Sequence, residues 1–219
     1  MRCLNKKVKL IFSVEHAKNT IPKDFSYLFR GNDEILKSHR GYDIGVLSLA
    51  KKISKYFNTQ LFYGKYSRLL IDLNRSENHK KIFSEFTDAL DRKSKNEIIE
   101  KFYVPYRNSV EKKIDYFIKR KYFVIHISFH SFTPVLNGKT RNFDIGLLFD
   151  PAREYEYKIC SGFKKKFLSI NNIVKIYFNK PYRGTTDGFT SYLRKKFKSD
   201  FYAGIELEIN QKHFTNKKI

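Results

Sequence analysis

The stretch from residue 123 to residue 134 constrains the fold most, because a strongly apolar strand pattern runs directly into a polar loop. Its first half, Phe-Val-Ile-His-Ile-Ser-Phe-His, is rich in β-branched and aromatic residues, which favour a strand in a sheet covered on both faces. Pro134 and Gly138 then force the backbone out of regular structure. In open α/β sheets, ligands bind at the carboxyl ends of the strands. We therefore expect His130 to stand at such an end and to bind a metal or move a proton; the alternative is that it caps the strand and bonds to a nearby carbonyl.

Two further strand patterns also lead into ionisable side chains. Residues 8–14 read as a strand that ends before Glu15 and His16, and a strand near the C-terminus carries Glu206 and Glu208. Such groups converge once the chain folds, although they lie far apart in the sequence. Two histidines with carboxylates nearby make up the composition of a hydrolytic zinc site. No local HExxH helix motif is present, so the pattern suggests a metal site without defining it.

The remaining hydrophobic periodicity alternates strands with helices. Helical spacing covers residues 44–57, 97–120, 155–168 and 189–197, and short strand patterns cover residues 60–63, 67–71, 144–149 and 173–177. Pro105 should bend or split the longest helix, and the polar residues 76–95 should form a loop or a short helix. This alternation predicts an α/β protein. We expect three αβα layers in one domain over residues 1–219, with a mostly parallel mixed sheet and helices on both faces.

The net charge of +22, from 44 basic and 22 acidic residues, has two readings. One is a nucleic-acid or anionic-membrane partner. The other is mutational bias, because lysine, asparagine, isoleucine and phenylalanine are abundant together and tryptophan is absent. The lysines lie in scattered pairs within predicted helices, and no nucleic-acid-binding motif is visible. We therefore expect no nucleic-acid partner.

The same sequence sets expectations for compartment. No apolar run is long enough to span a bilayer, so we expect no membrane association through a spanning helix. Cys3 and Cys160 can form at most one disulfide, which indicates a reducing, cytoplasmic environment. The oligomeric state is left open.

Several motifs, in order, resemble the N-formylglutamate amidohydrolase family over nearly the whole chain. They are Ser-Val-Glu-His-Ala-Lys-Asn-Thr-Ile-Pro (13–22), His-Arg-Gly-Tyr-Asp-Ile-Gly (39–45), Tyr-Ser-Arg-Leu-Leu-Ile-Asp-Leu-Asn-Arg (66–75), His-Ser-Phe-Thr-Pro (130–134), Gly138, Arg141, Asn-Lys-Pro-Tyr (179–182) and Glu-Leu-Glu-Ile-Asn-Gln (206–211). The resemblance implies a metal-dependent amide hydrolase with a three-layer, phosphorylase/hydrolase-like fold similar to that of the zinc carboxypeptidases. Its reaction would remove an N-formyl group from an acidic amino acid.

For the metal we expect one zinc per chain, bound by His16, Asp43 and His130. The resemblance places Asp43 near the end of the first strand, although an aspartate at a helix start can also be an N-cap. Glu15 is the alternative carboxylate. Neighbouring strand residues point to opposite faces, which counts against Glu15 and its neighbour reaching one metal. His39 is kept out of the metal set and is either a substrate contact or simply exposed.

The resemblance favours Glu208 as the general base that takes a proton from water and passes it to the leaving amine. Glu206 has the same strand parity and is the alternative base. Either glutamate could instead form a structural ion pair with one of the many cations.

Four arginines stand out in a chain that otherwise uses lysine: Arg68, Arg75, Arg141 and Arg183. Arginine offers a planar fork that binds a carboxylate with two hydrogen bonds. We expect Asn74, Arg75, Arg141 and Arg183 to bind substrate. Arg68 is expected to polarise the amide carbonyl, a role that Arg141 could also take. The alternative for each is a salt bridge, for example between Arg68 and Asp72, and Asp72 is expected to support the site rather than to act as a catalyst.

Two hypotheses of different class follow. The leading one is a zinc-dependent amidohydrolase that cleaves the N-acyl amide of a small acidic amino acid such as N-formylglutamate. The other is a non-catalytic, basic protein that binds nucleic acid or another polyanion on the same fold. The metal content of the purified protein separates them.

Overall fold

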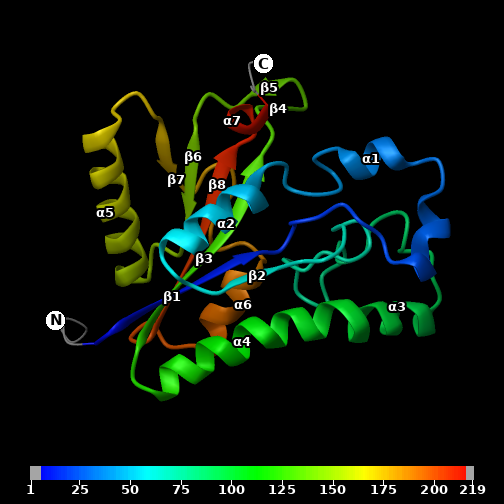
Figure 1. Ribbon diagram of the computed structural model, residues 1–219, viewed down its shortest axis with the longest axis horizontal. Coiled ribbons are helices and arrows are strands. Elements are labelled where there is room, and N and C mark those ends of the chain that lie inside the picture. Colours follow the sequence, from blue (N-terminus) through cyan, green and yellow to red (C-terminus); the bar gives the residue numbers. More distant parts are fainter. Residues whose placement is uncertain (1–5, 216–219) are drawn as a thin grey trace.

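A six-stranded sheet forms the centre of the computed structural model, which describes residues 6–215 (Figure 1). Its strands follow the order β2-β1-β3-β8-β6-β7. Their bounds are β1 Val8–Val14, β2 Leu61–Tyr63, β3 Phe123–Phe132, β6 Ile145–Leu148, β7 Ile176–Phe178 and β8 Tyr202–Asn210. Strands β2, β1, β3 and β8 are mutually parallel, whereas β6 runs antiparallel to β8 and parallel to β7. The predicted mostly parallel mixed sheet is confirmed. A separate hairpin, β4 Val135–Leu136 and β5 Lys139–Thr140, lies in the loop after β3.

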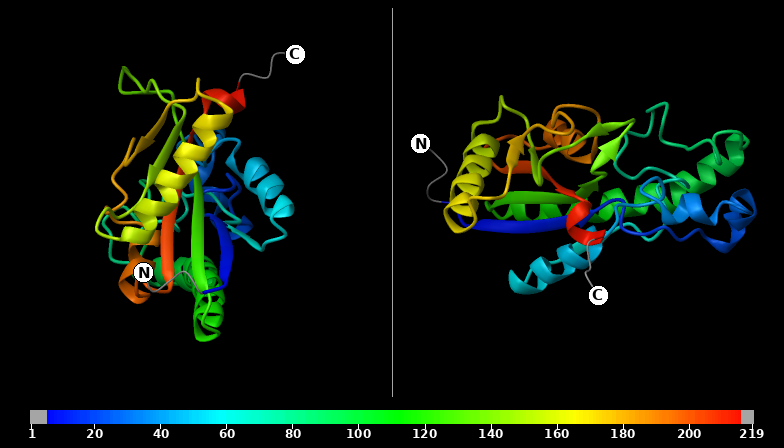
Figure 2. Two further views of the ribbon diagram at one scale, coloured as in Figure 1. Left: turned by 90° about the vertical axis from the view of Figure 1, so that its left-hand side faces the viewer. Right: turned by 90° about the horizontal axis from the view of Figure 1, so that it is seen from above.

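Helices cover both faces of this sheet, as Figures 1 and 2 show. The α-helices are α1 Asp33–Lys37, α2 Val46–Tyr56, α3 Arg92–Ile98, α4 Val104–Lys119, α5 Glu154–Ile170, α6 Phe189–Lys196 and α7 Lys212–Thr215, with a 3-10 helix at Lys23–Phe29. Helices α2 and α5 pack on one face, and α4 and α6 pack on the other. The expected three-layer αβα arrangement is therefore present. No helix in the described part of the chain is long and apolar enough to cross a membrane.

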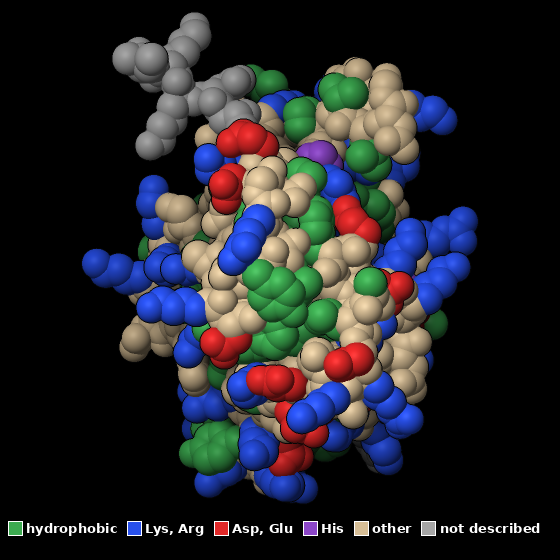
Figure 3. All heavy atoms as spheres, turned by 90° about the vertical axis from the view of Figure 1, so that its right-hand side faces the viewer, with side chains coloured by type: hydrophobic (Ala, Val, Ile, Leu, Met, Phe, Trp, Pro, Cys, Tyr) green, Lys and Arg blue, Asp and Glu red, His purple; other side chains and the backbone are tan. Residues whose placement is uncertain are grey.

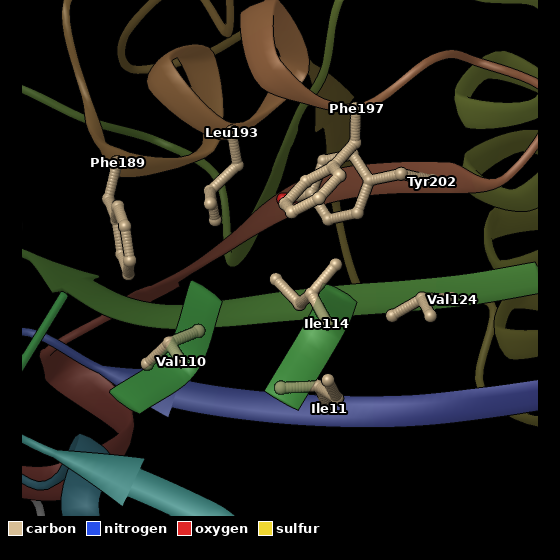
Figure 4. Packing of buried hydrophobic residues seen from close by; sticks show 8 residues of the cluster. All are labelled: Ile11, Val110, Ile114, Val124, Phe189, Leu193, Phe197 and Tyr202. Carbon is tan, nitrogen blue, oxygen red and sulfur yellow. The ribbon is translucent and has the colours of Figure 1, made fainter. Parts of the chain in front are cut away.

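The core beneath α4 and α6 explains why these helices settle on that face. Val110 and Ile114 lie four residues apart on one side of α4 and are fully buried. They meet Ile11 of β1 and Val124 of β3, and α6 contributes Phe189 and further apolar side chains (Figure 4). Burying each such side chain contributes roughly 1.5–3 kcal/mol. This packing fixes the distance between α4 and the strands that carry the polar residues described below.

The long helix predicted over residues 97–120 begins earlier and has an internal π-helical turn. Asp91 caps its start by accepting a hydrogen bond from the Ser94 backbone N–H at 2.7 Å. The turn spans Ile99–Tyr103, and Pro105 follows two residues after its end, in the first turn of α4. Because proline has no backbone N–H and its ring clashes with the preceding turn, a wider turn accommodates it. The predicted split therefore appears as a π-helical segment between α3 and α4.

The predicted strand over residues 67–71 is wrong, because the structure has turns there. Ser67 is tied to two other loops: its N–H donates to Thr20 O and its hydroxyl donates to Gly41 O, both at 2.8 Å. These contacts replace a strand ladder and hold the next residues, including Arg68 and Asp72, against the end of β1. The other predicted elements are present, with ends shifted by a few residues.

Candidate active site

The carboxyl ends of β1 and β3 bring together the three predicted metal ligands. β1 and β3 are adjacent and parallel, so His16, just beyond β1, lies near His130 of β3. Asp43 joins them from the loop before α2, where its N–H donates to the His16 carbonyl at 2.9 Å. One ligand atom from each of these three buried residues lies within 4.8 Å of the other two. The predicted convergence is therefore observed.

The donor atoms of this cluster fit a divalent metal ion. Asp43 Oδ2 lies 2.9 Å from His130 Nδ1 and 3.5 Å from His16 Nδ1. The His16 Nδ1 atom is buried and has no hydrogen-bond partner among the described residues. A buried nitrogen without a partner is costly, and a metal ion shared with the neighbouring imidazole and carboxylate would satisfy it. Two imidazoles and one carboxylate form a common ligand set of catalytic zinc sites.

Each histidine also contacts a further carboxylate through its other ring nitrogen, Nε2. Asp72 Oδ1 lies 2.6 Å from His16 Nε2, and Glu15 Oε2 lies 3.3 Å from His130 Nε2. The Ser128 hydroxyl is 3.0 Å from the same His130 nitrogen and also donates to Glu15. Carboxylates in this position fix the tautomer and ring orientation of metal-binding histidines. Both imidazoles are thus turned with Nδ1 toward Asp43.

Glu15 therefore stands behind His130 and supports it, whereas Asp43 faces both histidines. The Tyr106 hydroxyl, from α4, donates to Glu15 Oε1 at 2.9 Å and completes the partners of this fully buried carboxylate. Burial would raise the pKa of Glu15, but the charge and hydrogen bond of His130 outweigh it and hold the pKa below its usual range. Of the two carboxylates considered for the third metal ligand, the geometry favours Asp43.

The carboxylates around His130 favour the charged form of its imidazole. Burial would lower the pKa of His130, but the carboxylates of Asp43 and Glu15 raise it well above its usual value. Burial likewise opposes ionisation of Asp43, yet the two histidines keep its pKa below the ordinary range. A metal ion that binds here would compete with a proton for these ligand atoms.

Arg68 bridges two of these acids. Its Nη1 donates to Asp43 Oδ1 at 3.3 Å and its Nη2 donates to Asp72 Oδ2 at 3.2 Å. The salt bridge with Asp72 considered for this residue is thus present, and 28% of the Arg68 side chain remains exposed at the edge of the cluster. Asp43 does not act as an N-cap, because the N-cap of α2 is Gly45.

Glu208 lies opposite His130 in the register between β3 and β8. Its Oε2 atom is buried and unpartnered among the described residues. Burial raises the pKa of Glu208 from its ordinary value of 4.5 to about 7. By contrast, Glu206 accepts a hydrogen bond from the Thr190 hydroxyl at 2.7 Å and is already engaged. The geometry favours Glu208 as the proton carrier.

Two predicted substrate residues lie beside the cluster and also make structural contacts. Asn74 Oδ1 accepts a hydrogen bond from the Phe189 N–H at 2.7 Å, at the start of α6. Arg75 donates to the Asp187 carbonyl at 3.1 Å, its Nε lies 4.0 Å from Asp72, and 34% of its side chain is exposed. Both residues reach the site next to Asp72.

The other two predicted substrate residues lie on loops further along the chain. Arg141 follows the β4–β5 hairpin and packs near the rings of Phe132 and Tyr182. Arg183 is exposed in the loop before α6. His39 is exposed as well, in agreement with its exclusion from the metal set.

Sequence reasoning missed the residues that support the ligands. His126, Ser128 and His130 alternate along β3 and so share one face of the sheet. His126 bonds to the hydroxyls of Ser13 and Tyr202, at 2.7 Å and 2.9 Å. The His-x-Ser-x-His spacing in the sequence could have predicted that these polar side chains lie side by side on one buried face of the strand. No local signal marks Tyr106, because its contact with Glu15 spans 91 positions.

Comparison with known proteins places this chain in a family. The model of the N-formylglutamate amidohydrolase family matches residues 8–215. The chain belongs to this family. Its structure is similar to that of a gene product from Agrobacterium tumefaciens, with a TM-score of 0.79 and 27% identity over 97% of this chain and 84% of the other. It also resembles in fold the N-formylglutamate amidohydrolase from Ralstonia eutropha JMP134, with a TM-score of 0.69 and 15% identity over 95% and 83% of the two chains. No curated protein matched significantly.

Proposed function

We propose that this N-formylglutamate amidohydrolase family member removes the N-acyl group, in the first instance formyl, from N-formylglutamate or a similar small acidic amino acid. The observation that carries the proposal is the buried cluster of His16, Asp43 and His130, with a carboxylate behind each histidine. These three residues would hold one zinc ion. Family membership supports the hydrolytic reaction, and the printed name of the Ralstonia protein supports the substrate class.

When bound, a zinc ion supplies the acidity that makes a water molecule reactive near neutral pH and the charge that opposes a developing oxyanion. Glu208 takes the proton of the attacking water and delivers it to the leaving amine nitrogen. Its unpartnered Oε2 leaves one oxygen available for this task. Its pKa of about 7 is suited to both accepting and donating a proton.

The arginines would recognise the charged parts of the substrate. Arg75, with Asn74 beside it, is proposed to bind the α-carboxylate. Arg141 and Arg183, on the two loops, are proposed to contact the side-chain carboxylate, which a fork-shaped cation binds better than lysine does. Arg68 already balances Asp43 and Asp72, and its partly exposed guanidinium is proposed to face the amide carbonyl as negative charge develops there.

The decisive experiment is a substrate screen on zinc-loaded protein. N-formyl, N-acetyl and N-succinyl derivatives of glutamate, aspartate and alanine are incubated with the protein, and the free amine is quantified. We expect the highest kcat/KM for a formylated acidic amino acid, and loss of activity on chelation that zinc restores. A protein that purifies without metal, hydrolyses none of these compounds and binds polyanions would instead be the non-catalytic binding protein.

A further inference from the structure

A groove of about 500 Å³ lies between strand β2 and helix α4, outside the site described above. Its strand side is formed by consecutive residues, 61–66, so it touches both odd and even positions of β2. A surface on one face of a strand would meet only alternate residues. The groove therefore runs along the edge of the strand rather than over a face. Its volume is in the range of pockets that bind small ligands or peptide side chains.

That edge carries backbone groups suited to pair with another strand. β2 is the first strand of the sheet and pairs only with β1 among the described strands. The Gly64 N–H donates to Val14 O at 2.9 Å, so Phe62, two residues earlier, also turns its N–H and C=O toward β1. Leu61 and Tyr63 consequently point theirs into the groove. No hydrogen bond within residues 6–215 involves these outward groups.

The opposite wall is one face of the helix that passes the edge. Phe102, Pro105, Tyr106 and Ser109 recur at helical spacing and line the groove. Two cations complete the lining: Lys65 is exposed, and Lys101, with 53% of its side chain exposed, forms a surface ion pair with Glu97 at 2.5 Å. Such exposed ion pairs are weak, so Lys101 can exchange this partner for a carboxylate of the ligand. An apolar wall, an unpaired strand edge and two cations form one continuous surface.

This surface is separated from the metal cluster. Ile71 and Leu73 line the groove, whereas Asp72 between them turns toward His16. Tyr106 likewise presents its ring to the groove and its hydroxyl to Glu15. The groove and the candidate active site therefore lie on opposite sides of these residues, and a ligand of the groove can differ from the substrate.

We propose that this groove binds an extended peptide segment of a partner protein by strand addition to β2. The segment would be apolar at its centre, to pack against α4, and acidic at its ends, to meet Lys65 and Lys101. Main-chain pairing supplies affinity in this mode of recognition, and side-chain pockets supply specificity. A second copy of this chain fits less well, because pairing of two β2 edges would bring together two molecules that each carry a net charge of +22.

The test uses a fluorescein-labelled peptide, acetyl-Asp-Val-Phe-Val-Asp, and fluorescence anisotropy with the full chain. We expect saturable binding that is weakened about tenfold when alternate peptide amides are N-methylated, since two edge hydrogen bonds are then lost. The Lys65→Glu/Lys101→Glu variant should weaken binding to a similar or greater extent. The matched control, Lys165→Glu/Lys166→Glu, makes the same charge change on α5 across the sheet and should bind as the wild type does.

A protein variant tests the strand edge directly. Tyr63→Pro removes an outward N–H and leaves the pairing of Phe62 and Gly64 with β1 intact, so it should weaken peptide binding while circular dichroism stays unchanged. Equal binding of the methylated peptide, equal losses in the α5 control, or no saturable binding would overturn the proposal. So would a concentration-dependent dimer in sedimentation that Tyr63→Pro abolishes, because a second copy would then occupy the edge. None of these results depends on the hydrolytic activity.

Discussion

Buried carboxylate oxygens without partners are rare in folded proteins, and Glu208, opposite His130 in the sheet, has one among the described residues. Its neighbour Glu206 shows the ordinary situation, with its carboxylate engaged by a threonine hydroxyl. We predict that Glu208→Gln keeps fold and metal but loses most hydrolysis, by roughly a hundredfold or more in kcat, the range for loss of a general base. Glu206→Gln should retain turnover. Steady-state kinetics and metal analysis of both variants check this, and a dead Glu206→Gln with an active Glu208→Gln would reverse the assignment.

The raised pKa of Glu208 also predicts a pH dependence of stability in the metal-free protein. Between its ordinary value of 4.5 and about 7, the folded state keeps a proton that the unfolded state releases. Stability conferred by the protonated group is therefore present below pH 4.5 and is lost as pH rises through 7. The loss is at most about 3 kcal/mol. Urea unfolding at pH 5 and pH 8 should show the wild type losing stability relative to Glu208→Gln; a constant difference would contradict the raised pKa.

Arg75 lies where a substrate role and a structural role must be separated. It donates to the Asp187 carbonyl and stands near Asp72, yet a third of its side chain is exposed. We predict that Arg75→Lys weakens substrate binding by about 1.5–3 kcal/mol, because lysine keeps the charge but not the fork. The loss should be large for a free α-carboxylate and small for the corresponding amide. Equal losses on both substrates, with a lowered melting temperature, would mean that Arg75 only stabilises the fold.

At the scale of elements, helix α4 reaches the proposed metal site through the hydroxyl of Tyr106. Tyr106 donates to Glu15, and Glu15 holds His130. We predict that Tyr106→Phe lowers zinc affinity about tenfold, the lower end for loss of a group that orients a ligand. Tyr103→Phe is the matched control on the adjoining π-helical turn, because its hydroxyl donates to the Arg75 carbonyl instead. Chelator competition measures both affinities, and equal affinities would exclude this route from helix to metal.

What the sequence predicts at this scale follows from local patterns. The strands that lead to His16, His130 and Glu208 are rich in apolar residues and so could be predicted. Parallel strands present their carboxyl ends at one edge of a sheet, so the convergence was foreseeable. The failed strand over residues 67–71 has a suitable local pattern, but Ser67 is held by loops that are distant in sequence. The contact between Glu15 and His130 could not be predicted from the sequence either, because it depends on how β1, β3 and helix α4 pack together.

At the scale of the whole molecule, the net charge of +22 bears on the choice of partner, and the proposed metal site bears on stability. On the face shown in Figure 3, lysine and arginine side chains are interspersed with acidic ones and with a central hydrophobic group, rather than forming one stripe. This distribution agrees with a basic composition spread over a solvated surface. The absence of a nucleic-acid partner remains a prediction.

The proposed metal site should add to the stability of the fold when zinc is bound, because its candidate ligands come from three distant segments of the chain. A ligand that binds only the folded state stabilises it by about 2.7 kcal/mol at a hundredfold excess over its Kd. We therefore predict that chelation of zinc lowers the melting temperature by roughly 5–10 °C, given about 2–4 °C per kcal/mol for a chain of this size. Combined replacement of His16 and His130 by alanine should abolish both bound zinc and this shift. Metal analysis and thermal unfolding with and without chelator test the prediction together, and unchanged zinc in the double variant would place the metal elsewhere.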